Sequence, residues 1–139
     1  DDCEFPVLAR CLVDAGADVI AVPACTDTRA GAMRVRIGAR ARALEGQCIT
    51  VAAATVGPAP WCPAVDVNRG SAGVFGPPDT GFPDTGILAQ GPRDAPGWTC
   101  ATLDPAAIST VRREGQVRNH AHWPEQHGTH IRVTKHTVP

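Results

Sequence analysis

The sequence predicts an α/β fold, in which helices pack against a sheet that contains parallel strands. Two short, continuous apolar segments at residues 18–23 and 48–54 have the length and β-branched composition of buried strands. Each follows a segment in which apolar residues recur with helical spacing. Strands that alternate with helices along the chain are the usual pattern of layered α/β folds.

The first half of the chain is predicted to contain two helices. The first begins at Phe5 or Pro6, because proline is favoured in the first turn, and Gly16 is suited to end it. A loop at residues 24–31 precedes the second helix, which covers residues 32–46. The apolar stripe expected on this second helix consists of Met33, Ile37, Ala41, Leu44 and Cys48.

The second half is rich in glycine and proline, which predicts loops at residues 57–63 and 76–86. Three short strands are expected around them, at residues 72–75, 87–90 and 98–103. Asp104 is a good N-cap for a last helix over residues 105–114, which starts with proline. From Gly115 onward we expect an extended polar chain, in which Trp123 docks onto the fold or onto a partner chain.

Composition and charge exclude several classes of protein. The chain has 139 residues, with 13 Lys and Arg against 14 Asp and Glu, so its net charge is −1. Binding to nucleic acid would need a clear basic excess. No apolar segment approaches the roughly 20 residues of a membrane-spanning helix. The six cysteines are scattered without a Cys-x-x-Cys pair, so we predict reduced thiols, a cytoplasmic location, and no nucleic-acid or membrane partner.

Five motifs follow one another in an order that matches a known family. They are Asp2-Cys-Glu-Phe-Pro6 with Gly16-Ala-Asp18, Arg42-Ala-Leu-Glu45, Gly70-Ser71 with Gly76-Pro77, Leu103-Asp104 with Arg112, and Asn119-His-Ala-His-Trp-Pro-Glu-Gln126. In this order they resemble the nitrilase superfamily, the carbon–nitrogen hydrolases. The last motif is similar to a subgroup in which some members carry an added acetyltransferase domain.

The resemblance implies the C-terminal half of a four-layer α-β-β-α sandwich over residues 1–128, followed by a polar tail at residues 129–139 that is not assigned to the domain. Members of the superfamily use a Cys nucleophile, a Glu base and a Lys that helps to stabilise the oxyanion. When the motifs are aligned, the nucleophile precedes Asp1, whose backbone N–H contributes to the oxyanion hole. The Glu and Lys also lie upstream, so we expect an inactive fragment without catalytic side chains of its own.

The resemblance also places a substrate pocket on the loop after the first strand. Its residues are Ala24, Cys25, Thr26, Asp27 and Arg29. Ligands of α/β sheets bind at the carboxyl ends of the strands, which agrees with this position. Two interpretations of the three polar residues remain open, namely substrate selection and a capped turn before the second helix.

Three further features have structural interpretations. As a nucleophile, Cys3 would lie three residues too close to Pro6, so we interpret it as a passive cysteine of the core or rim. Arg42 and Glu45 are three residues apart on one helix and are expected to pair as a structural brace. A zinc site needs three or four ligands on an ordered frame. We therefore predict no metal and no cofactor for the histidines of the tail, which are His120, His122, His127, His130 and His136.

The predicted function is that of a carbon–nitrogen hydrolase that cleaves a small amide or nitrile-type bond. A homo-oligomer is expected, because members of the superfamily commonly dimerise through inner helices and C-terminal segments. The alternative is a catalytically inactive homologue or a module that serves only in assembly.

Overall fold

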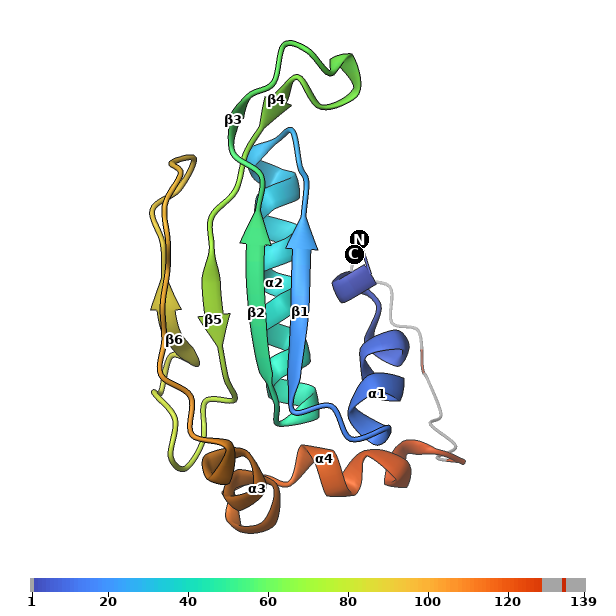
Figure 1. Cartoon of the computed structure of the whole chain (residues 1–139). Coiled ribbons are helices and arrows are strands. Elements are labelled where there is room, and N and C mark those ends of the chain that lie inside the picture. The colour runs from blue at the N-terminus through green and yellow to red at the C-terminus, as the bar shows by residue number, and fades with distance from the viewer. Residues whose placement is uncertain (1, 129–133, 135–139) are drawn as a thin grey trace, which may run out of the picture.

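Four strands build the sheet on which the fold is organised (Figure 1). The computed structural model describes residues 2–128 and residue 134. The strands are β1 (Val19–Ala24), β2 (Ile49–Ala54), β5 (Gly73–Phe75) and β6 (Ile87–Gln90). They lie in the order β1-β2-β5-β6, with β1 and β2 parallel and the other two pairs antiparallel. A separate hairpin of β3 (Gly57–Pro58) and β4 (Val67–Asn68) extends beyond the carboxyl ends of β1 and β2.

Helices cover one face and one end of this sheet. They are α1 (Pro6–Asp14), α2 (Arg29–Gly46), α3 (Pro105–Glu114) and α4 (Asn119–His122), with the 3-10 turns η1 (Asp2–Glu4), η2 (Pro63–Val65) and η3 (Trp123–Gln126). α2 lies along β1 and β2, α1 lies beside β1, and α3 and α4 cross the end at which β1 and β2 begin (Figure 1). The arrangement confirms the predicted α/β class. None of the helices described is both long and apolar enough to span a bilayer.

Helix starts follow the capping residues in the sequence. α1 and α3 begin with a proline as predicted, and the Asp104 carboxylate accepts a hydrogen bond from the Ala106 N–H at 2.9 Å. α2 begins three residues earlier than predicted, because the Thr28 hydroxyl accepts a hydrogen bond from the Gly31 N–H at 3.1 Å and caps the helix there.

The predicted apolar stripe of α2 is wrong for most of its length. Met33, Ile37 and Leu44 are exposed, and only Cys48, just beyond the helix, is fully buried. The buried face of α2 instead carries mainly small residues, which are Gly31, Val35, Gly38, Ala39, Ala43 and Gly46, together with Arg42. Small side chains let the helix approach the sheet and η1 closely, so steric fit decides which face is buried here.

Two predictions for the second half are also wrong. Residues 98–103 form no strand, and the Trp98 side chain is 99% exposed. The chain after Gly115 is not simply extended, because α4 and η3 are helical. The Trp123 ring docks on α1, where the Arg10 guanidinium lies 5.2 Å from the ring centroid. This contact, together with the bond from the Arg10 guanidinium to the His120 carbonyl at 3.1 Å, gives the helical segment a tertiary anchor.

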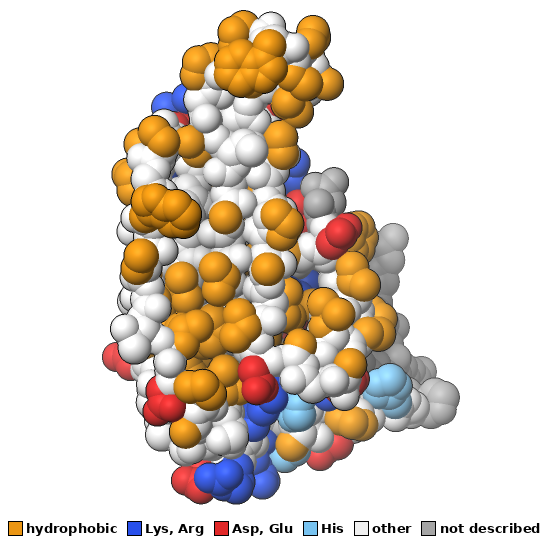
Figure 2. All heavy atoms as spheres, in the orientation of Figure 1, with side chains coloured by type: hydrophobic (Ala, Val, Ile, Leu, Met, Phe, Trp, Pro, Cys, Tyr) orange, Lys and Arg blue, Asp and Glu red, His pale blue; other side chains and the backbone are white. Residues whose placement is uncertain are grey.

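The sheet face opposite α2 is apolar; the described residues leave it uncovered at β1, whereas α3 and the chain beside it cover part of β2 and β5. In β1, Ile20 and Val22 are buried toward α2, whereas Val19, Ala21 and Pro23 are exposed. Figure 2 shows hydrophobic side chains gathered over this face. Such a face is typical of a sheet that packs against a second sheet in a sandwich.

Candidate functional site

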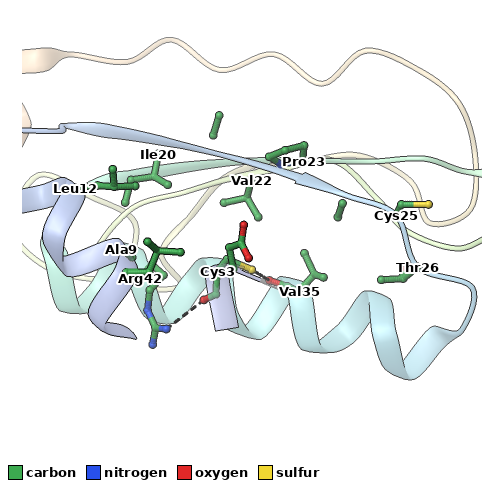
Figure 3. A pocket seen from close by; sticks show the side chains of 14 residues that line it. Cys3, Ala9, Leu12, Ile20, Val22, Pro23, Cys25, Thr26, Val35 and Arg42 are labelled. Carbon is green, nitrogen blue, oxygen red and sulfur yellow. Dashed lines mark hydrogen bonds between the residues drawn. The ribbon is translucent and has the colours of Figure 1, made fainter. Parts of the chain in front are cut away.

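A groove of about 260 Å³ lies between β1, α1 and the turn η1 (Figure 3). Residues of η1, α1, β1, α2 and the loop after β1 line it, among them Cys3, Leu12, Val22, Cys25 and Arg42. β1 is at the edge of the sheet, and its outer edge has no partner strand among the described residues. The groove therefore joins the carboxyl end of an edge strand to the segment that carries the first motif.

The turn η1 is fastened to α2 at the floor of this groove. The Arg42 guanidinium donates a hydrogen bond to the Cys3 carbonyl at 3.1 Å, and the Cys3 thiol donates to the Val35 carbonyl at 3.7 Å. A Cβ at Gly38 would lie 3.0 Å from the Cys3 carbonyl oxygen, so only glycine allows this approach without displacement. The position of η1 is thus set by α2.

The Cys3 thiol is not prepared for nucleophilic attack. Burial raises its pKa, and the thiol acts as a hydrogen-bond donor to a carbonyl. The thiolate is the reactive form of cysteine, and a raised pKa reduces its population at neutral pH. The local environment agrees with the interpretation of Cys3 as a passive residue.

Arg42 and Glu45 form the ion pair expected from their spacing. The Arg42 guanidinium lies 3.0 Å from both carboxylate oxygens of Glu45, and its side chain is only 7% exposed. The same guanidinium holds the Cys3 carbonyl. The pair therefore braces α2 and also fixes η1.

The five predicted pocket residues are divided between different places. Ala24, Cys25 and Thr26 line the groove. Asp27 is exposed and lines none of the described pockets, and Arg29 lies in a different groove beside α2. The divergence follows from the early start of α2, because Arg29 is its first residue and leaves the loop there.

Hydrogen bonds fix the loop after β1 to the hairpin. The Thr26 hydroxyl donates to the Arg69 carbonyl at 2.7 Å, so this hydroxyl holds the loop against the chain that follows β4. The Cys25 thiol donates to the Asn68 side-chain carbonyl at 3.2 Å. Thr55 donates to the same oxygen at 2.8 Å, and Asn68 is 6% exposed. Asn68 could not be recognised from the sequence, since a single Asn in a glycine- and proline-rich region carries no distinguishing signal.

Other predicted site residues lie partly outside the described chain. Asp1, the predicted oxyanion-hole residue, is not described, and neither are His130 and His136. Within residues 2–128, no three His, Cys, Asp or Glu side chains are arranged to hold a metal ion. Burial, followed by the charges of Arg112 and Arg10, lowers the pKa of His120.

The curated proteins that are similar to the chain in sequence are described as a probable hydrolase and an amidase. No family model matches the chain. The probable hydrolase YhcX of Bacillus subtilis is 37% identical over 117 residues, which is 84% of this chain and 23% of that protein. A deaminated glutathione amidase of Yersinia enterocolitica is 45% identical over 56 residues, which is 40% of this chain and 20% of that protein. The chain thus spans less than a quarter of the length of these relatives.

Two solved structures share the fold. Nit3 of Saccharomyces cerevisiae, described as a member of branch 10 of the nitrilase superfamily, matches with a TM-score of 0.64 and 23% identity, over 81% of this chain and 38% of that one. The NitFhit protein of C. elegans matches with a TM-score of 0.64 and 27% identity, over 80% of this chain and 24% of that one. In fold, the chain is therefore similar to members of the nitrilase superfamily, and in sequence it is similar to a probable hydrolase and to an amidase.

Proposed function

We propose that the chain forms one wall of the active-site groove of a carbon–nitrogen hydrolase that cleaves a small amide or nitrile. The observation that carries the proposal is the position of η1, which lines the groove and which the Arg42 guanidinium holds through the Cys3 carbonyl at 3.1 Å. In the alignment of motifs, the residue that precedes Asp1 is the nucleophilic cysteine. A side chain presented there would enter the groove from its η1 side.

In the proposed reaction, the thiolate attacks the amide or nitrile carbon, with Glu as base and Lys at the developing oxyanion, all three upstream of Asp1. The Asp1 backbone N–H adds a donor to the oxyanion hole. In comparable enzymes, removal of one such donor costs about 3 kcal/mol of transition-state stabilisation. Ala24, Cys25 and Thr26 form the wall at the end of β1. A largely apolar groove of about 260 Å³ suits a small substrate.

We also propose a cytoplasmic homo-oligomer. Large apolar side chains are exposed on the two helices beside the groove, namely Val7 on α1 and Ile37 and Leu44 on α2. Exposed apolar patches of this kind are typical of protein–protein contacts. An inactive homologue that serves in assembly would use the same surface, so activity and assembly must be measured separately.

The test uses protein produced from the complete coding sequence. Ammonia release is measured with a panel of small aliphatic amides and nitriles, for the unaltered protein and for three variants. Alanine in place of the residue before Asp1 should abolish turnover, whereas Cys3→Ala should leave it nearly unchanged. Cys25→Ala should change the KM more than the kcat, because Cys25 lines the groove without performing chemistry.

Two results would contradict the proposal. Turnover that is lost in Cys3→Ala but persists without the preceding residue would refute the alignment of the first motif. A well-folded oligomer without turnover, in which no cysteine precedes Asp1, would support the assembly role instead.

A further inference from the structure

A second groove lies beside the amino-terminal half of α2. It has a volume of about 410 Å³ and is lined by residues of α2 and of the segments around Gly70 and Arg93. None of its lining residues belongs to the groove between β1 and α1. It therefore needs an explanation separate from the proposed hydrolase site.

The second groove carries a concentration of positive charge. Three arginines line it, Arg29 and Arg36 from α2 and Arg93 from the loop after β6. Asp94 is the one carboxylate among the lining residues. Its two oxygens are already used, since one lies 3.3 Å from the Arg69 guanidinium and the other accepts the Gly70 N–H at 3.0 Å. The three guanidiniums are thus left without a balancing charge in the groove.

One arginine is held in place while two remain free to engage a ligand. The Arg36 guanidinium donates to the Gln90 side-chain oxygen at 2.5 Å and lies 5.3 Å from the centroid of the Phe75 ring. Burial, and then the charges of Arg40 and Arg93, lower its pKa. Within residues 2–128, the structure gives neither Arg29 nor Arg93 a hydrogen bond or ion pair, and both are exposed. An anion in the groove would offset the repulsion among these guanidiniums.

We propose that this groove binds a small molecule that carries a phosphate group. Guanidinium groups bind phosphate oxygens through paired N–H donors, which makes arginine the preferred residue for this ligand. Three guanidinium groups from two separate segments balance the charge of a doubly negative phosphate better than that of a ligand with a single carboxylate. Ser71 also lines the groove, and its hydroxyl would add a neutral donor. A volume of about 410 Å³ falls in the range of small-molecule sites.

The test measures binding of inorganic phosphate and pyrophosphate by isothermal titration calorimetry, at constant ionic strength and with protein from the complete coding sequence. Arg93→Gln and the double variant Arg29→Gln/Arg93→Gln should raise the Kd for pyrophosphate, by about tenfold for each lost bidentate contact. Arg113→Gln is the matched control, because Arg113 is an exposed arginine of α3 whose described partner is Glu114 at 2.9 Å. It should leave the Kd unchanged. Arg93 is exposed, so its replacement is not expected to unfold the protein.

Three results would overturn the proposal. The first is equal weakening by Arg113→Gln and Arg93→Gln, which would indicate a general effect of net charge. The second is citrate binding that is as tight as pyrophosphate binding, which would contradict phosphate as the preferred group. The third is the absence of saturable binding of both inorganic phosphate and pyrophosphate. Binding to vesicles that contain phosphatidic acid would not rescue the proposal in that case, because it would indicate a membrane surface and not a small molecule as the ligand. These binding measurements do not depend on hydrolase activity. Their outcome therefore tests the phosphate site independently of the proposed function.

Discussion

Replacement of Gln47 by alanine should destabilise the C-terminal part of the fold. Gln47 is 1% exposed, and its side-chain amide donates to the carbonyls of Val111 at 3.0 Å and Val117 at 2.9 Å. Its side-chain oxygen accepts the His120 N–H at 3.1 Å. One side chain at the end of α2 thus connects the end of α3, the following turn and α4.

The cost can be worked out from these three bonds. A hydrogen bond in a folded protein contributes about 0.5–1.5 kcal/mol net, and a buried group left without a partner costs about 1–3 kcal/mol. Val111 keeps the Gly115 N–H as a donor at 3.0 Å, so its carbonyl is not orphaned. The bonds to the Val117 carbonyl and from the His120 N–H are only partly buried, so we expect water to reach both groups once the side chain is removed. We expect a loss of about 2–4 kcal/mol in the free energy of unfolding, which lowers the urea midpoint by roughly 1–2 M.

Urea unfolding followed by tryptophan fluorescence measures this loss, and hydrogen exchange at the His120 amide measures it locally. Gln116→Ala is the matched control, because Gln116 is exposed and its one hydrogen bond within residues 2–128 is from its backbone N–H to Asp79 at 2.9 Å. Its effect should stay within about 0.5 kcal/mol. Equal midpoints for the two variants, or unchanged exchange at His120 in Gln47→Ala, would refute the role of Gln47 as the connection.

Two further predictions concern ionisable groups. Iodoacetamide at pH 8 should label the exposed thiols of Cys11, Cys25 and Cys100 in the native protein. Cys48 should stay unlabelled, because it is buried and burial raises its pKa to about 11. Mass spectrometry that finds Cys48 modified without denaturant would contradict this prediction. Burial opposes ionisation of Asp79, but backbone N–H donors of Gln116, Thr80 and Val117 outweigh it and lower its pKa. A lowered pKa in the folded state means that the stabilisation is present above the ordinary Asp value and is lost as the pH falls below about 4. Thermal melts from pH 6 to pH 3 should therefore fall less steeply for Asp79→Asn, and parallel profiles would argue against the contact.

Local signals predicted the starts of α1 and α3 and the two buried strands β1 and β2. Pro6 and Asp104 act through neighbouring backbone groups, so their effect can be recognised without knowledge of the tertiary structure. The face of α2 could not be recognised in this way. Met33 and Ile37 follow a good helical stripe, yet the side that packs is the one with Gly38 and the alanines. Which side is buried depends on how closely η1 and the sheet can approach, and that is a property of the assembled fold.

The candidate site shows the same limit at the end of β1. Sheet geometry alone leads one to expect a groove at the carboxyl end of a strand, and the carboxyl end of β1 borders one in the structure. Which loop residues enter the groove depends on one cap. The Thr28 hydroxyl starts α2 at Arg29, so Arg29 leaves the loop and lines a groove with Arg36 and Arg93 instead. A serine in place of Thr28 would preserve that cap, whereas an alanine would remove the acceptor for the Gly31 N–H. The cap at Thr28 therefore positions Arg29 away from the proposed hydrolase groove and beside the other arginines.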